Sequence, residues 1–216
     1  MEDLKLWDDV ADEYEDYTYN GELEMHPANK YRSRIVMDFL KDLFENEGRK
    51  ILDAGCGTGF VSRLILKQGW NCISVDQSPE MIRVSKQKSE VEGLVGDFRQ
   101  GLVTDLGQFQ DGEFEVVLLL GVLPYIEEEN EIKVFEECRR VLKKGGYLIL
   151  ANYNELFKML FNNLGTVKVL NNELVKGNVE FDEKVFEIDE NFKTMKMENP
   201  LTYNDKLKKF GFTEER

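Results

Sequence analysis

The stretch from Ile51 to Gly59, with the sequence Ile-Leu-Asp-Ala-Gly-Cys-Gly-Thr-Gly, constrains this chain more than any other. Its apolar beginning predicts the end of a buried strand, and residues 60–67 place apolar side chains at helical spacing. Glycine at alternate positions lets the backbone turn sharply and leaves it bare, so that a ligand can lie directly against it. A strand, a glycine loop and a helix amino terminus in this order predict a nucleotide-type cofactor site.

The spacing of the glycines distinguishes two kinds of cofactor. A dinucleotide site uses G-x-G-x-x-G, whereas here Gly55, Gly57 and Gly59 follow Asp53, and Ser62 stands where a third glycine could fall. A carboxylate before the loop repels a pyrophosphate but suits a cationic ligand such as S-adenosylmethionine, which has an ammonium and a sulfonium. The stretch resembles the first motif of the class I S-adenosylmethionine-dependent methyltransferases. A glycine-rich turn of another α/β protein is the alternative interpretation of this stretch alone.

A second acid follows the next apolar segment. Residues 71–76 predict a buried strand that ends at Asp76, close to the spacing at which a carboxylate meets ribose hydroxyls. A carboxylate can accept both hydrogen bonds of a diol. Capping of the following helix is the alternative role, but Ser78 is the better cap because Pro79 occupies the first helical position. We therefore expect Asp76 to remain available for a ligand.

The resemblance to the methyltransferase family implies roles for further residues. Residues 94–98 predict a third short strand that ends in an acid, where the family binds adenine through the acid and the next backbone amide. Met81 is expected to pack on the adenine, with core packing as its alternative. The full predicted set of cofactor-binding residues is Tyr14, Asp53, Gly55, Gly57, Gly59, Asp76, Gln77, Met81, Asp97, Phe98 and Leu119. Tyr14 is included because such proteins place a cofactor-facing tyrosine before the first strand, and Leu119 because the nearby backbone would receive the methionyl amine.

Residues for the acceptor side are less sharply defined. Many small-molecule methyltransferases have a histidine pair where this chain has Pro124 and Tyr125, which argues against a histidine base at this strand end. Tyr125 still lies at the expected mouth of the substrate site, so it is expected to bind or orient the acceptor. His26 is the only histidine and the first candidate for a base near neutral pH, with a structural or exposed histidine as its alternative. Arg32 and Arg34 are candidates to meet the cofactor carboxylate, and a solvated arginine is the alternative for each.

Composition excludes several classes of partner. The chain has 216 residues, enough for one domain with a full core. Its net charge of −14 repels phosphate backbones and anionic membranes, so we expect neither a nucleic-acid nor a membrane partner. Its three cysteines lack metal-ligand spacing and predict reduced, buried thiols in a cytoplasmic protein without a metal. We expect no signal peptide, and the longest apolar run, Val116–Leu123, is too short to span a bilayer.

Taken along the chain, the elements predict a three-layer α/β/α sandwich with a mostly parallel, Rossmann-like sheet. A fully apolar strand is expected at 114–123, a helix at 127–142, a Lys-Gly-Gly turn and then a strand at 147–152. We divide the chain into an N-terminal helical cap over the cofactor (1–46), a cofactor-binding core (47–152), an insertion that shapes the acceptor pocket (153–200), and a C-terminal helix with the start of a sixth strand (201–216). The family usually adds an antiparallel edge, so we expect that edge to be truncated here.

The predicted function is transfer of a methyl group from S-adenosylmethionine to an oxygen or nitrogen of a small molecule, leaving S-adenosylhomocysteine. A faint similarity of residues 198–203 to methyltransferases of bacterial surface-sugar pathways suggests a sugar or phosphorylated metabolite as the acceptor. A non-catalytic S-adenosylmethionine-binding regulator is the first alternative, and a dinucleotide-dependent oxidoreductase is the second. The oligomeric state stays open.

Overall fold

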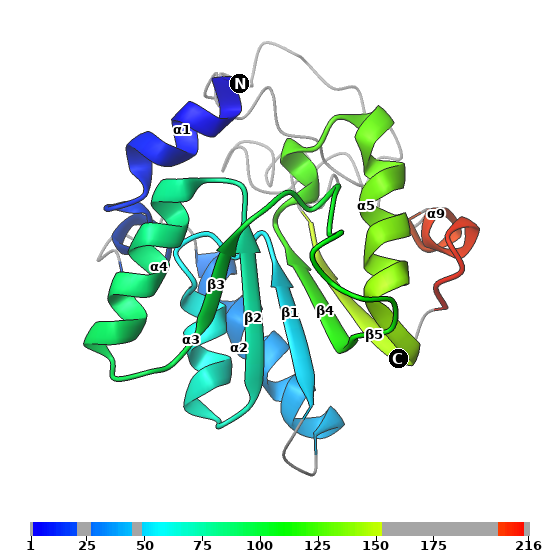
Figure 1. The fold of residues 1–216 in the computed structure, drawn as a ribbon, viewed down its shortest axis with the longest axis horizontal. Coiled ribbons are helices and arrows are strands. Elements are labelled where there is room, and N and C mark those ends of the chain that lie inside the picture. The colour runs from blue at the N-terminus through cyan, green and yellow to red at the C-terminus, as the bar shows by residue number, and fades with distance from the viewer. Residues whose placement is uncertain (1, 21–26, 45–48, 153–202, 214–216) are drawn as a thin grey trace, which may run out of the picture. The chain divides into compact units, whose positions relative to one another are not determined.

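A computed structural model of the chain describes residues 2–20, 27–44, 49–152 and 203–213 (Figure 1). Its elements in chain order are α1 (Glu2–Val10), the π-helix η1 (Asp16–Asn20), α2 (Pro27–Leu43), β1 (Lys50–Ala54), α3 (Phe60–Lys67), β2 (Asn71–Asp76), α4 (Pro79–Val91), β3 (Asp97–Gln100), β4 (Phe114–Leu120), the 3-10 helix η2 (Leu123–Tyr125), α5 (Glu128–Val141), β5 (Leu142–Ala151) and α9 (Tyr203–Lys209). The chain divides into two units. The larger unit contains the whole sheet, and the smaller one contains η2 and α9.

The larger unit is built on a five-stranded sheet in the order β3-β2-β1-β4-β5, in which every neighbouring pair is parallel. This arrangement confirms the predicted Rossmann-like α/β class. The strand order reverses between β1 and β4, and in open parallel sheets such a reversal opens a crevice at the carboxyl ends of the strands. The sheet topology therefore places the glycine loop, which follows β1, at the edge where ligands bind.

Helices cover both faces of this sheet. Right-handed connections place α3 and α4, which link β1 to β2 and β2 to β3, on one face and α5 on the other. In the view of Figure 1, α2 and α3 lie behind the strands. One core cluster joins these two helices to β1, β2 and β4 through Val36, Met37, Leu40, Phe44, Ile51, Val61, Ile65, Cys72, Val116, Leu118 and Leu120. Alternate residues of β4, together with Ile51 of β1 and Cys72 of β2, thus pack one face of the sheet against α2 and α3.

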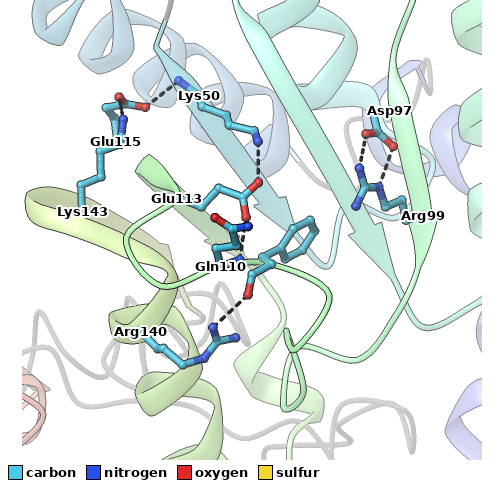
Figure 2. A network of polar contacts seen from close by, with 9 residues as sticks. Lys50, Asp97, Arg99, Gln110, Glu113, Glu115, Arg140 and Lys143 are labelled. Atoms are coloured by element: carbon cyan, nitrogen blue, oxygen red, sulfur yellow. Dashed lines mark hydrogen bonds and ion pairs between the residues drawn. The ribbon is translucent and has the colours of Figure 1, made fainter.

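The third strand departs from the sequence prediction. We predicted a strand at 94–98 that ends in an acid, but β3 begins at Asp97 and ends at Gln100, which pairs with Asp76. The Asp97 carboxylate instead pairs with Arg99, with Oδ2 lying 2.6 Å from Nη2 (Figure 2). Side chains two positions apart in a strand lie on the same face, which brings the two groups of this exposed pair together. The prediction that Asp97 closes its strand is therefore wrong.

The fifth strand also starts earlier than predicted. β5 runs from Leu142, so the residues that we expected to form a turn, 143–146, lie within its assigned length. The pairing with β4 shifts register between Phe114 and Val116, which accommodates the irregular glycine-containing start of β5. From Val116 onward the pairing is regular.

Ion pairs gather at the amino ends of the strands. The Lys50 ammonium lies 2.5 Å from Glu113, and its backbone amide donates to Glu115, which also pairs with Lys143 (Figure 2). On α5, the Arg140 guanidinium donates to the carbonyl oxygens of two residues in the segment between β3 and β4. This edge of the sheet is closed by contacts within the chain, opposite the edge of the glycine loop.

Several other expectations concern residues at the limits of the described structure. Cys72 and Cys138 are buried free thiols as predicted, whereas Cys56 in the glycine loop is half-buried. The predicted C-terminal helix is present as α9, but residues 212–213 form no strand, and 214–216 lie outside the described residues. The insertion predicted at 153–200 also lies outside them. Within the described ranges, no helix is long and apolar enough to cross a membrane, and no group of His, Cys, Asp and Glu side chains could hold a metal ion.

Candidate functional site at the glycine loop

The glycine loop connects β1 to α3 and is shaped by close approaches of its backbone. Gly55 has φ 81°, and a Cβ there would lie 2.3 Å from the side chain of Val122, which follows β4. Gly59 has φ 72°, and a Cβ there would lie 2.8 Å from the Phe98 ring. A side chain at either position is excluded by sterics and by backbone conformation. At Gly57, by contrast, the nearest atom is Cε1 of Tyr14 at 3.8 Å, so Tyr14 lies beside the loop.

Asp76 lies at the end of β2 and holds this loop. One carboxylate oxygen accepts from the Gly57 amide at 2.8 Å, and the other accepts from the Ser78 amide at 2.9 Å. Burial raises the pKa of Asp76, and these amide bonds oppose that rise by favouring the charged form. Each carboxylate oxygen can accept a second hydrogen bond, so both retain capacity for a ligand hydroxyl. Ser78 caps α4 as predicted, because its hydroxyl accepts from the Met81 amide and Pro79 follows it.

Asp53 lies within β1, just before the loop, and is only 3% exposed. Its carboxyl oxygen accepts a 2.5 Å hydrogen bond from the Ser62 hydroxyl on α3. Burial raises the pKa of Asp53 to about 6. The hydrogen bond from Ser62 opposes this rise, the negative charge of Asp76 adds to it, and the positive charge of Arg32 opposes it. Ser62, at the position where a dinucleotide-binding fold could have glycine, therefore donates a hydrogen bond that holds the Asp53 carboxyl group. We did not predict this pairing, although both residues lie in the strand–loop–helix stretch that the sequence singled out.

Arg32 of α2 reaches the same edge of the sheet. A Cβ at Gly121, just after β4, would lie 2.8 Å from Arg32 Nη1, and Nη2 donates to the Tyr19 hydroxyl at 3.3 Å. Within the described residues its Nε is buried and lacks a hydrogen-bond partner. Arg34 is different, because its side chain is 80% exposed and lies 3.9 Å from Asp38. The structure therefore separates two arginines that the sequence could not distinguish.

The end of β3 supplies a residue that the sequence analysis did not select. Gln100 pairs in register with Asp76, and its amide nitrogen donates to the backbone oxygen of Gln77 at 3.1 Å. Both glutamines thus lie at the carboxyl edge. Met81, on the first turn of α4, is 2% exposed and belongs to a cluster with Ala11, against which Trp7 and other residues of the N-terminal segment pack. In this conformation Met81 is a core residue.

The other predicted site residues differ in position. Asp97 lies three positions before the carboxyl end of β3, whereas the buried Phe98 ring packs under the glycine loop at Gly59 and acts there as a packing residue. The physical reason is the register of β3, which begins where we expected it to end. The Leu119 side chain is fully buried, but its backbone lies one residue before the carboxyl end of β4, where the prediction needs it. Tyr125 ends η2 in the smaller unit, and His26 lies outside the described residues. The structure therefore brings together the predicted residues Tyr14, Asp53, Gly55, Gly57, Gly59, Asp76 and Gln77 in and around one loop, with Arg32 and Gln100 at the same edge of the sheet.

Comparison with known proteins agrees with this geometry. A family model described as a methyltransferase domain matches residues 52–150. A ubiquinone biosynthesis O-methyltransferase of Actinobacillus pleuropneumoniae is 27% identical over 76% of this chain and 70% of its own length. Another protein of the same name, from Maricaulis maris, is 30% identical over 62% of this chain and 54% of its own length. A crystal structure of a Pyrococcus horikoshii protein superimposes with a TM-score of 0.57 at 28% identity, covering 68% of this chain and 66% of that one.

Proposed function

We propose, from the premise that the chain belongs to the class I S-adenosylmethionine-dependent methyltransferases, that it transfers the sulfonium methyl group to an oxygen of a small-molecule acceptor. Support for oxygen as the target comes from the relatives, which are named O-methyltransferases. The chain spans only part of their length, about half to 70%. The observation that carries the cofactor assignment is the buried Nε of Arg32, which has no hydrogen-bond partner among the described residues, at the edge where Asp76 holds the glycine loop.

The residues at this edge fit the parts of the cofactor. The Arg32 guanidinium is suited to the amino-acid carboxylate, because it is the cation whose buried donor lacks an acceptor among the described residues. Asp53 supplies negative charge below the loop for the ammonium and sulfonium, together with backbone carbonyls near Leu119. Asp76 is suited to the ribose diol. We transfer the adenine-facing role from Asp97 and Phe98 to the strand end at Gln100, because Gln100 is the residue level with Asp76.

Chemically, the bound sulfonium supplies an activated methyl group with a good leaving group. The chain therefore has to bind and orient two reactants in line and exclude water, and it needs a strong base only for an acceptor that ionises with difficulty. Tyr14 beside Gly57 is suited to covering the loop. For the acceptor side we propose Tyr125 and His26 on the sequence alone. The free cysteines support a reducing compartment such as the cytoplasm.

The relatives do not support a surface sugar as the methyl acceptor. It was suggested by residues 198–203, most of which lie outside the described part of the chain, and the relatives are named for ubiquinone biosynthesis instead. We propose a small molecule with an ionisable hydroxyl, such as a phenol, because an acidic hydroxyl reduces the need for a strong base.

Calorimetric titration with S-adenosylhomocysteine tests the cofactor site. Asp76→Ala should weaken binding by about 1–3 kcal/mol, as expected for a lost charged hydrogen bond, and Arg32→Met should weaken it comparably. Arg34→Met is the matched control, since that side chain is exposed, and it should bind like the wild type. Binding of a nicotinamide dinucleotide in place of S-adenosylhomocysteine would overturn the proposal in favour of an oxidoreductase.

A transfer assay with methyl-labelled S-adenosylmethionine and a panel of phenols, sugars and amines then tests the activity. We expect label on phenolic oxygens. Tight S-adenosylhomocysteine binding without turnover on any acceptor would favour the non-catalytic regulator.

A further inference from the structure

A buried group of charged side chains joins the N-terminal segment to the glycine loop. Its centre is Arg63 on α3, only 2% exposed, whose Nη2 donates to both carboxylate oxygens of Glu15 at 2.8 and 2.9 Å. Arg63 Nη1 donates to the Thr58 carbonyl at 2.7 Å, and Nε donates to Glu92 at 2.9 Å. Lys88 of α4 lies 3.4 Å from Glu15. We call these five residues the Glu15 cluster.

Glu15 is the only member of the Glu15 cluster that comes from the N-terminal segment. Glu15 is 6% exposed, and its carboxylate also accepts from the Thr58 hydroxyl at 3.3 Å. Glu15 therefore contacts the glycine loop directly at Thr58 and indirectly through Arg63, which donates to the Thr58 carbonyl. A buried arginine that loses one carboxylate partner keeps its charge and its donors without compensation. The contacts with Arg63 therefore fix the position of Glu15, and Glu15 in turn helps to hold the glycine loop at Thr58.

The residue before Glu15 is Tyr14, whose ring lies beside Gly57 and makes an edge contact with Trp7. Other contacts of this segment are of a different kind. Asp12 pairs with Arg83 on α4 at 2.6 Å, but the Asp12 side chain is 75% exposed, and exposed pairs contribute little. Glu15 thus provides a buried ionic contact one residue from the ring that faces the loop.

We propose that Glu15 is a positioning residue for the methyl-donor site: through Arg63 and Thr58 it holds Tyr14 beside Gly57 of the glycine loop and so raises cofactor affinity without touching the cofactor. This inference rests on the proposed function. A purely structural Glu15 would lower the stability of the whole unit and leave the affinity of the folded protein unchanged. A positioning Glu15 loosens the N-terminal segment selectively and weakens cofactor binding while the sheet stays intact.

The test compares Glu15→Gln with the matched control Asp12→Asn, which removes a carboxylate charge from the same segment at an exposed ion pair. Amide hydrogen exchange of residues 5–16 is measured against that of β1 and β4, and S-adenosylhomocysteine affinity is measured by calorimetry. For Glu15→Gln we expect at least tenfold faster exchange in the segment, unchanged exchange in the strands, and at least tenfold weaker binding. Asp12→Asn should change neither quantity by more than about twofold.

Tyr14→Ala provides the second arm. If Glu15 acts through Tyr14, the affinity losses of Tyr14→Ala and Glu15→Gln will not add in the double variant. Should Glu15→Gln fail to fold, Glu15→Gln combined with Arg63→Met replaces the buried pair by neutral groups of similar size and should fold with the same weakened binding.

Three results would distinguish a failure of the positioning role from a failure of the proposed function. Wild-type affinity in folded Glu15→Gln, with Asp76→Ala weakened, overturns the positioning role and leaves the proposed function standing. Additive losses in the double variant with Tyr14→Ala also overturn it. No S-adenosylhomocysteine binding by the wild type overturns the proposed function and, with it, this inference.

Discussion

Environment gives three aspartates of the sheet different proton affinities. Burial raises the pKa of Asp53 to about 6 and also raises that of Asp76, whereas the Arg99 guanidinium lowers the pKa of Asp97. Residue type alone could not distinguish them. Only Asp53 and Asp76 lie by the glycine loop, where a cationic ligand would favour their charged forms.

Asp53 should make stability depend on pH. Its pKa is raised from 3.8 to about 6, so between these values the native state binds more protons than the unfolded state. The free energy of unfolding contributed by this group therefore falls as pH rises through that window and stays low above it. Relative to Asp53→Asn, the wild type should lose about 1–3 kcal/mol between pH 4.5 and 7. Urea denaturation of both proteins across this range measures the difference, and parallel pH profiles would contradict it.

At the scale of elements, the connection between β1 and α3 depends on how closely neighbouring helices and strands approach. Gly59 caps α3, and a Cβ there would also lie 2.9 Å from Cβ of Ser85 on α4. The loop is thus wedged between β3 and α4 on one side, while Gly55 packs on Val122 on the other. Two of the three glycines that the sequence associated with a ligand, Gly55 and Gly59, are thus required by packing, whereas Gly57 is not.

Gly59→Ala and Gly69→Ala separate conformation from packing. Both glycines have positive φ, 72° and 77°, but a Cβ at Gly69 would meet nothing within 4 Å. Gly69→Ala should cost about 1–2 kcal/mol of unfolding free energy from the left-handed conformation alone. Gly59→Ala adds overpacking and should cost about 2–5 kcal/mol in total. Equal losses for the two variants in urea denaturation would show that packing at Gly59 is unimportant.

At the scale of the whole sheet, parallel strands give its two edges different tasks. The amino edge is closed by pairs such as Lys50 with Glu113 (Figure 2) and by Arg140, which fastens the segment before β4. The carboxyl edge carries the glycine loop, Asp76 and Arg32. Stability and ligand binding should therefore respond to substitutions at different edges.

Arg140→Met tests this separation. Arg140 donates to the carbonyl oxygens of Leu106 and Phe109 and pairs with Glu137, so its loss should lower the free energy of unfolding by about 1–3 kcal/mol. Affinity for S-adenosylhomocysteine should be unchanged. Arg139→Met, at an exposed neighbouring position, serves as the control for loss of one positive charge. A weakened cofactor affinity in Arg140→Met would show that the two edges are coupled.

Much of the architecture follows from local patterns. The apolar run of β4, the helical spacing of 60–67 and the Ser78-Pro79 start of α4 each predicted the observed element. Asp97 shows where such patterns fail. An apolar segment followed by an acid, as at residues 94–97, resembles the end of a strand, but the observed strand begins at Asp97. Helix and strand limits that depend on neighbouring elements, as at Leu142, were missed for the same reason.

The amino-acid sequence by itself determined the order of strands and helices, the position of the glycine loop and the family, because periodicity and short motifs act over a few neighbouring residues. Tertiary structure alone decided which of two arginines reaches the carboxyl edge of the sheet, that Gln100 and not Asp97 pairs with Asp76, and that Glu15 is buried on Arg63. These facts depend on register and on contacts between residues far apart in the chain, such as the 48 positions that separate Glu15 from Arg63. No local pattern encodes them, because the partner of each group is chosen by packing of the whole unit.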